Sequence, residues 1–329
     1  MTQLNVSEIR EQLIERRDRL QDSVKRFGEA GNLVYLLQEV DAALERITNN
    51  TYGICIVCNE SIEVDRLKVD PLIKVCLDHM NAAQQKMLEQ DLGLASKIQH
   101  GLLPKNDLIA AGWEIFYSYL PAGAVSGDYC DIIEYKDGTD SLLFLLGDVS
   151  GKGVAASLLM SHMRAMFHSL ISFDLKVNSL VERANRLFCE STISSHFATL
   201  VCGKANSKGE IEICSAGHNP PLLIKKNEII KIGSTGVPIG LFCDSGYDSK
   251  SFVVDVGDIL FLYSDGLTES SSNDEEYGEE RLVKIVSSLR NSSPKELVNG
   301  VLEDLNLFLS GNSKTDDLTI LALKRVNSN

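Results

Sequence analysis

Long hydrophobic runs are missing from this 329-residue sequence. The longer apolar stretches, such as residues 142–146, are far too short to cross a bilayer. The N-terminus also lacks a short apolar block behind a basic start, and begins with a charged helical pattern. We therefore expect no signal peptide, no association with a membrane, and a cytoplasmic location.

Basic residues are scarce relative to acidic ones. The chain has 32 Lys and Arg against 46 Asp and Glu, for a formal net charge of −14. Nucleic-acid binding depends on clustered Lys and Arg, so we expect no nucleic acid as a partner. Clustered carboxylates instead suit divalent cations. Gly and Pro are not in excess, and 44% of residues are hydrophobic, so the chain is expected to fold into two or more domains.

Five of the eight cysteines stand alone in apolar or strand-like segments. Isolated cysteines of this kind are typically reduced, buried and apolar in character. This interpretation applies to Cys130, Cys189, Cys202, Cys214 and Cys243.

The first 50 residues are predicted to form a helical hairpin. Apolar residues recur at helical spacing over residues 4–27 and again over 33–47, and glycines at 28 and 31 interrupt the pattern. Two amphipathic helices joined by a short turn make an antiparallel pair. Composition does not distinguish a spacer from a dimer contact. A further helical run, the linker helix at residues 81–104, ends at Pro104.

Residues 51–80 contain two metal-ligand pairs. Two residues separate Cys55 from Cys58 and Cys76 from His79, and seventeen residues lie between the pairs. This spacing is typical of a tetrahedral zinc site with no open position for catalysis, so one structural Zn²⁺ is predicted. A lone C-x-x-C could be a redox pair, but the second pair at matched spacing argues against that.

From about residue 113 the hydrophobic period changes to that of strands. Two consecutive helices interrupt the series, at about 154–171 and 177–192. Many strands with two helices set between them predict an α+β sandwich. The expected strands are 113–120, 129–135, 142–146, 198–203, 211–214, 222–225, 251–254, 259–263 and 318–323.

Acidic motifs adjoin several of these strands. Asp148 follows strand 142–146, Asp265 follows strand 259–263, and Asp316 opens strand 318–323. Antiparallel neighbours could bring these three carboxylates to one end of a sheet, where hard oxygen ligands would hold Mg²⁺ or Mn²⁺. Two such ions about 3.5–4 Å apart can activate water for phosphoryl displacement. Any one motif alone would instead be an ordinary turn signal.

Residues 33–80 resemble the DksA/TraR zinc-finger family, in which a helical hairpin leads into a finger. His79 stands where that family usually has Cys, and the turn around Gly28 lacks the paired acidic residues that members insert into RNA polymerase. The resemblance therefore leaves RNA polymerase open as a partner. The residues that carry it are Ala42–Ile47, Thr51–Cys55, Arg66-Leu67 and Pro71.

Residues 113–325 resemble the SpoIIE/RsbU-type branch of the PPM (protein phosphatase 2C-like) family. The resemblance implies a β-sandwich flanked by helices over residues 105–329, and hydrolysis of phosphoserine or phosphothreonine on proteins. The matching motifs occur in family order: Pro121-Ala122, Gly127-Asp128 with Asp131, Gly147–Gly153, Asn185, Phe197–Thr199, Ala216–Pro221, Pro238–Leu241, Ser264–Glu269 and Asp316–Thr319.

The PPM resemblance also implies roles for individual residues. Asp148 would bridge two metals, and the Val149 carbonyl would bind one of them. Asp265 and Asp316 would hold the first metal and Asp128 the second, with Asp317 supporting the ligands beside it. The same resemblance assigns no chemistry to His218. Lys152 could attract phosphate or be a solvated residue at a helix start, and we favour the latter.

The family resemblances imply two functions of different class. The first is an active phosphatase acting on an anti-sigma-factor antagonist, with the linker helix forming a homodimer and relaying the state of the N-terminal module. Ile98-Gln99 and Leu102–Pro104 match such linkers. The second is a DksA-like, transcription-associated zinc-binding regulator whose phosphatase domain is a binding module.

Overall fold

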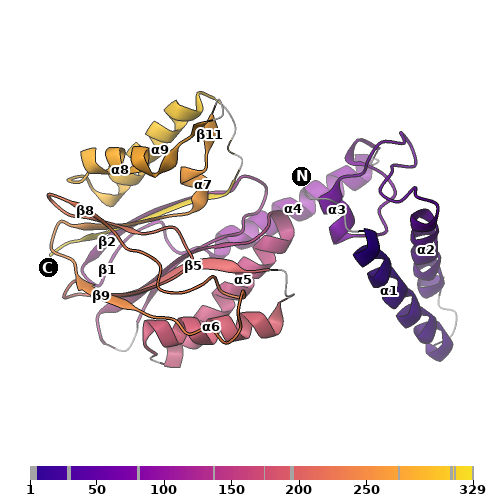
Figure 1. Ribbon diagram of the computed structural model, residues 1–329, viewed down its shortest axis with the longest axis horizontal. Helices are drawn as coiled ribbons and strands as arrows, with labels where there is room; N and C mark the ends of the chain where they lie inside the picture. Colours follow the sequence, from indigo (N-terminus) through magenta and orange to yellow (C-terminus); the bar gives the residue numbers. More distant parts are fainter. Residues whose placement is uncertain are drawn as a thin grey trace. The chain divides into compact units, whose positions relative to one another are not determined.

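The computed structural model divides into two compact units, Met1–Asp91 and Leu92–Asn329. It describes residues 6–27, 31–79, 82–135, 138–173, 175–192, 196–272, 275–311, 314 and 316–327. The division falls inside the predicted linker helix, and the finer domain limits at residues 50, 80 and 104 stay predictions. Figure 1 labels many of the elements of each unit. Within the described ranges, no helix is long and apolar enough to cross a membrane.

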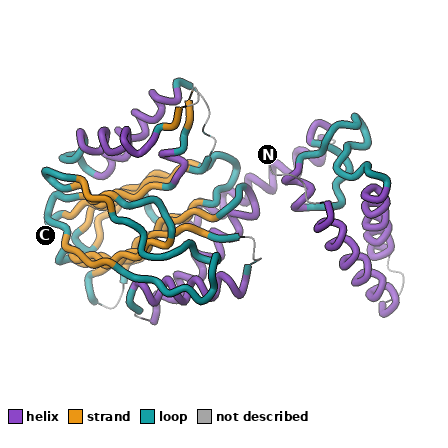
Figure 2. Tube along the Cα trace, viewed as in Figure 1, coloured by secondary structure: helices purple, strands orange, loops and turns teal. Residues whose placement is uncertain are grey.

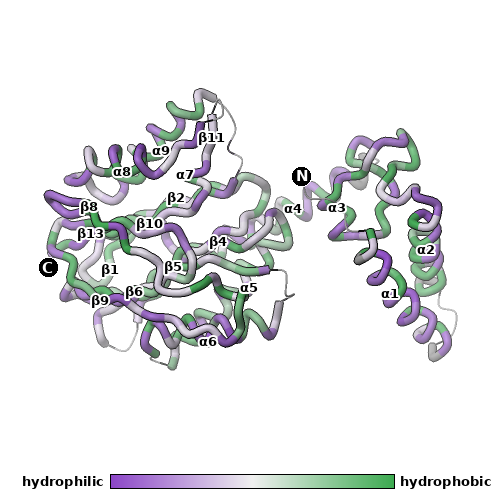
Figure 3. Tube along the Cα trace, viewed as in Figure 1, coloured by the Kyte–Doolittle hydropathy of each residue, from purple (hydrophilic) through white to green (hydrophobic). Residues whose placement is uncertain are grey.

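The first unit contains the predicted helical hairpin. Helices α1 (Val6–Phe27) and α2 (Gly31–Thr48) pair along their lengths, while the predicted turn at Gly28 lies outside the described residues. Ile9 and Leu13 of α1 belong to one buried cluster with Val40 and Ala43 of α2. Polar and apolar residues intermix along α1 (Figure 3), as expected for a helix with one buried face.

The segment after α2 folds onto the same cluster, with the short helix α3 (Val64–Val69) and a 3-10 turn, Leu77–His79. The hydroxyl of Tyr52 donates to the Pro71 carbonyl at 2.9 Å. The guanidinium of Arg46 lies 5.7 Å from the Tyr52 ring centre and donates to the Ile73 carbonyl at 3.3 Å. These contacts fasten the cysteine-containing segment to α2. Helix α4 (Ala82–Leu102) follows and continues into the second unit.

The second unit is built on two antiparallel sheets (Figure 2). The six-stranded sheet has the order β1-β2-β13-β10-β7-β8, and the five-stranded sheet has the order β3-β4-β5-β6-β9. The first sheet comprises β1 (Asp107–Ala110), β2 (Trp113–Leu120), β7 (Leu222–Ile224), β8 (Ile229–Lys231), β10 (Ile259–Tyr263) and β13 (Leu318–Arg325). The second comprises β3 (Asp128–Glu134), β4 (Ser141–Val149), β5 (Ala198–Asn206), β6 (Glu210–Ala216) and β9 (Lys250–Val253). Strands β11 (Ser271–Ser272) and β12 (Glu275–Glu276) form a separate pair.

Helices cover the outer face of each sheet (Figure 1). Helices α5 (Gly153–Leu170) and α6 (Val177–Ser191), with a 3-10 turn at Ile171–Phe173, pack on the five-stranded sheet. Helices α8 (Gly278–Ser288) and α9 (Pro294–Leu309) pack on the six-stranded sheet, and α7 (Asp265–Thr268) follows β10. A third apolar cluster fills the space between the sheets. Both faces of the central strands are therefore buried, which explains the continuous apolar runs at residues 142–146 of β4 and along β10.

The predicted α+β sandwich is confirmed, including every expected strand and both helices between them. Sequence analysis missed the helices α3, α7, α8 and α9 and the short strands β1, β8, β11 and β12.

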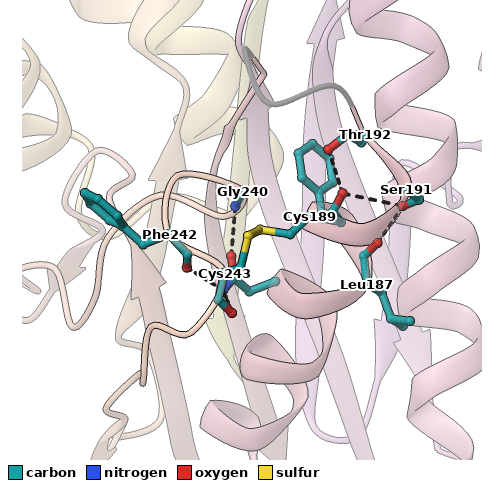
Figure 4. The surroundings of a disulfide bond; sticks show 9 residues. Leu187, Cys189, Ser191, Thr192, Gly240, Phe242 and Cys243 are labelled. Atoms are coloured by element: carbon teal, nitrogen blue, oxygen red, sulfur yellow. Dashed lines mark hydrogen bonds between the residues drawn. A yellow bond between two sulfur atoms is a disulfide. The ribbon is translucent and has the colours of Figure 1, made fainter.

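Two cysteine predictions were wrong. Cys189 of α6 and Cys243 form a disulfide with a Cα–Cα distance of 5.7 Å (Figure 4). The sequence separates them by 54 residues, and they meet because the loop containing Cys243 is held against α6. The Asn185 amide donates to the carbonyls of Phe242 and Cys243 and accepts from the Gly240 N–H. The other three predicted residues, Cys130, Cys202 and Cys214, are buried and unpaired as expected.

Candidate metal centre

Four of the predicted carboxylates converge from both sheets. Asp128 and Asp148 are directly opposite each other in the β3–β4 register of the five-stranded sheet. Asp265 begins α7 two residues after the end of β10, and Asp316 lies two residues before β13, the neighbour of β10 in the six-stranded sheet. The expectation that Asp148, Asp265 and Asp316 share one sheet end was therefore wrong. The two sheets stack with their ends together, so each sheet contributes two carboxylates.

Asp128 is held by hydroxyl groups of the facing sheet. Its side chain is buried, and its Oδ2 accepts from Ser264 Oγ at 2.9 Å and from Thr319 Oγ1 at 2.5 Å. Ser264 Oγ also accepts from the Thr319 N–H at 2.9 Å, so the three residues form one network between the sheets. The other oxygen, Asp128 Oδ1, is buried without a hydrogen-bond partner. A buried acceptor of this kind fits a cation ligand.

The electrostatics of the cluster favour a cation. Burial, followed by repulsion from Asp265 and Asp316, raises the pKa of Asp148 to about 7. Burial raises the pKa of Asp128 well above its usual range, and Asp148 adds to the effect. Burial and then Asp316 raise the pKa of Asp265. The ionised carboxylates of these residues have too little positive charge near them, and a bound Mg²⁺ or Mn²⁺ would supply it. The donor set therefore fits such ions.

Lys152 places one positive charge at the cluster. It precedes the first residue of α5, and its Nζ lies 2.9 Å from Asp316 Oδ2. The hydrogen bond to Asp316 raises the pKa of the Lys152 ammonium. The side chain is 62% exposed, as expected for a residue at a helix start, but it is also ion-paired with a predicted ligand.

The backbone at Gly127 passes close to Asp148 and Val149. A Cβ atom at this position would lie 3.0 Å from the Val149 carbonyl oxygen and 3.5 Å from Asp148 Oδ1. Asp317 accepts hydrogen bonds from the N–H groups of Ala122 and Gly127, both at 2.8 Å. Because both carboxylate oxygens of Asp317 are used in this way, the residue holds the 122–127 loop against the cluster. The supporting role expected for Asp317 stays a prediction.

His218 has a structural position that the sequence did not indicate. The ring is buried, and its Nδ1 lies 2.8 Å from Thr199 Oγ1. Thr199 is paired with Asp148 in the β4–β5 register. Burial lowers the pKa of His218 to about 4, against the opposing effect of the Tyr263 backbone carbonyl. The imidazole is therefore neutral near pH 7 and supports the strand next to Asp148.

The cysteine pairs of the first unit also converge. The ligand atoms of Cys55, Cys58, Cys76 and His79 all lie within 4.8 Å of one another. Cys76 Sγ lies 3.8 Å from Cys58 Sγ and 3.1 Å from His79 Nδ1. Burial opposes ionisation of the Cys55 thiol, but backbone N–H groups of Cys58 and Cys76 outweigh it and lower its pKa to about 6. Thiolates and one imidazole in this arrangement fit Zn²⁺.

Within the described part of the chain, the Cys–His set is the one group of three or more His, Cys, Asp or Glu side chains whose ligand atoms lie close enough together to hold a metal ion as they stand.

Comparison with known proteins identifies the class of the second unit. Its fold matches the SiaA-PP2C domain of Pseudomonas aeruginosa with a TM-score of 0.65 at 20% identity, covering 74% of this chain and 99% of that one. It also matches the RsbU and RsbW domains of Rv1364c from Mycobacterium tuberculosis, with a TM-score of 0.58 at 28% identity over 69% of this chain and 62% of that one. Both matches show that the second unit has the PP2C fold.

The family follows from the sequence comparison. The family model described as stage II sporulation protein E (SpoIIE) matches residues 138–326, more than half of the chain. The chain belongs to this family. A relative, "Phosphoserine phosphatase RsbU" of Bacillus subtilis, is 26% identical over 268 residues, covering 78% of this chain and 79% of the relative. The predicted fold and the predicted enzyme class, a protein serine/threonine phosphatase, are thus confirmed.

Proposed function

We propose that the second unit removes phosphate from phosphoserine or phosphothreonine of a protein partner, using two Mn²⁺ or Mg²⁺ ions. The proposal rests mainly on the cluster of Asp128, Asp148, Asp265 and Asp316. Two sheets contribute these carboxylates, and too little positive charge lies near them to balance their ionised forms. Uncompensated carboxylates at the end of a rigid scaffold are costly, and a functional site is a common reason for them.

Each chain residue has a distinct task in this proposal. Asp148 would bridge the two ions, Asp265 and Asp316 would hold the first, and Asp128 the second. The Val149 carbonyl would add a backbone ligand, because Gly127 has no Cβ to crowd its oxygen. When bound, the ions would supply positive charge and lower the pKa of a water molecule. Ser264 and Thr319 orient the Asp128 carboxylate, and Asp317 fixes the loop that leads into it.

The partner proposed for this phosphatase is a small protein of the anti-sigma-factor antagonist type. Support comes from the relative named RsbU, a phosphoserine phosphatase, and from the structure in which an RsbU domain accompanies an RsbW domain. We also propose a homodimer formed through α4, whose Leu94 and Ile98 are each 58% exposed. A cytoplasmic location stays a prediction from the sequence.

We further propose that the first unit holds one structural Zn²⁺ through Cys55, Cys58, Cys76 and His79. The convergence of the four ligand atoms supports this assignment. Because such a short segment buries little apolar surface, the metal would contribute directly to its folding. The DksA/TraR resemblance of this unit, and RNA polymerase as a partner, stay hypotheses.

The decisive experiment measures phosphate release from a serine-phosphorylated protein by chelator-treated enzyme after Mn²⁺ is added back. We expect wild type and the exposed control Asp244→Asn to be active, and Asp148→Asn to lose nearly all activity because the ions lose their shared ligand. An inactive wild type would favour the transcription-regulator alternative. Full activity of Asp148→Asn would remove the two-metal mechanism.

A further inference from the structure

A buried glutamine of α4 contacts the backbone beside the metal centre. Gln99 is only 3% exposed, although nearby residues of α4 such as Ile98 face solvent. Its Nε2 donates to the Ser126 carbonyl at 2.7 Å, and its Oε1 accepts from the Ser126 N–H at 3.0 Å. One side-chain amide thus satisfies both polar backbone groups of a residue 27 positions away. Because this pairing uses two bonds, it fixes the orientation of the Ser126 peptide groups as well as their position.

Ser126 lies two residues before Asp128, in the loop that leads into β3. Its Oγ accepts from the Asp128 N–H at 3.0 Å. The next residue, Gly127, donates to Asp317 and accepts from the Val149 N–H at 3.3 Å. Its Cα passes so close to Asp148 that a Cβ would lie 3.5 Å from Asp148 Oδ1. A displacement of Ser126 would therefore be transmitted to the two carboxylates of the five-stranded sheet.

Attachment of α4 does not depend on Gln99 alone. The Leu102 carbonyl accepts from Arg164 Nε of α5 at 2.6 Å, and the Pro104 carbonyl accepts from the Tyr117 hydroxyl at 2.7 Å. These bonds hold the end of the helix and the residues after it, but they touch no part of the 126–128 segment. Gln99 differs from them because its partner is the loop that carries a predicted metal ligand.

We propose that Gln99 is a positioning residue of the metal centre: its amide holds the Ser126 backbone so that Asp128 and Asp148 are arranged to bind the ion they share. The inference rests on the proposed function. Its primary expected effect is on the affinity for the metal, and the effect on turnover follows from that. Replacing Gln99 by an apolar residue leaves the Ser126 N–H and carbonyl without their buried partner, so the segment must move to regain hydrogen bonds.

The test compares Mn²⁺ binding to full-length, zinc-loaded proteins by titration calorimetry. Gln99→Met keeps the side-chain length and removes both hydrogen bonds. Gln90→Met, at an exposed position of the same helix, is the matched control. We expect Gln99→Met to raise the Mn²⁺ dissociation constant about tenfold, and Gln90→Met to leave it unchanged. With p-nitrophenyl phosphate, Gln99→Met should lose turnover at limiting Mn²⁺, recover it at saturating Mn²⁺, and keep the wild-type KM.

Further variants distinguish failure of the proposed function from failure of the inference about Gln99. If wild type binds no Mn²⁺, or Asp148→Asn binds it as tightly as wild type, the proposed function fails. If both behave as proposed but Gln99→Met retains wild-type affinity and only melts at a lower temperature, Gln99 merely attaches the helix and the inference is wrong. Should Gln99→Met not fold, Gln99→Glu, which keeps the acceptor for the Ser126 N–H, decides between these outcomes by the same titration.

Discussion

Asp148→Asn should stabilise the metal-free protein while it removes activity. In the folded chain, Asp148 is surrounded by Asp265 and Asp316 and is largely removed from water, so its ionised form is disfavoured. Asparagine has nearly the same shape and no charge. The substitution therefore relieves repulsion that only a bound cation would otherwise offset.

The magnitude follows from the pKa of Asp148. Folding raises it from 3.8 to about 7, and each pKa unit corresponds to about 1.4 kcal/mol. Between these two values the folded state holds a proton that the unfolded state has lost, so the free energy of unfolding falls as pH rises. Above pH 7 the accumulated penalty is about 4 kcal/mol. For a domain of this size that corresponds to a rise in melting temperature of roughly 8–16 °C for Asp148→Asn.

The assay is thermal unfolding in EDTA at pH 5 and pH 8. We expect the advantage of Asp148→Asn over wild type to be larger at pH 8, because Asp148 of the wild type is then ionised. Adding Mn²⁺ should raise the melting temperature of wild type much more than that of the variant. A variant that melts below wild type in EDTA at pH 8 would refute the argument that the cluster is short of positive charge.

Three further predictions concern other parts of the chain. Elemental analysis should find one zinc per chain, and changing Cys55 and Cys58 together to Ser should remove it without altering hydrolysis of p-nitrophenyl phosphate; retained zinc would contradict the assignment. Changing Ile98 and Leu102 together to Asp should alter both sedimentation and turnover of a phosphoprotein at unchanged zinc content, and wild-type values of both would leave α4 as a spacer. Burial of His218 lowers its pKa from 6.5 to about 4, so about 3 kcal/mol of stability should disappear as pH falls through this range. His218→Gln should lose that pH dependence in denaturant titrations, and an unchanged slope would show that the ring is not buried neutral.

Sequence periodicity predicted most of the fold because the central strands carry uninterrupted apolar residues and the helices carry helical spacing. Strand β2 was predicted with both of its bounds, Trp113 and Leu120. Helices α8 and α9 were missed although α9 has a readable start signal. Ser293 and Glu296 form a reciprocal capping box with Pro294 at the first turn. That signal was available in the sequence.

The residue types and spacing determined which chemistry each unit can support. Cys55, Cys58, Cys76 and His79 are near enough in the chain for spacing alone to predict their convergence, and the structure brings them together. The acidic motifs likewise identified Asp148, Asp265 and Asp316 as candidate ligands, and the PPM resemblance added Asp128. What they could not show was that two different sheets supply them, because the stacking of sheets depends on the core packed between them.

Only the tertiary structure decided which distant side chains support this chemistry. The amide of Gln99 meets Ser126, His218 meets Thr199, and Cys189 meets Cys243, each across many residues of chain. A buried Gln or His has no periodic signature, since its position depends on a backbone or hydroxyl partner contributed by another element. The sequence thus determined the ligand chemistry and the strand pattern, while packing between elements determined how the ligands are held.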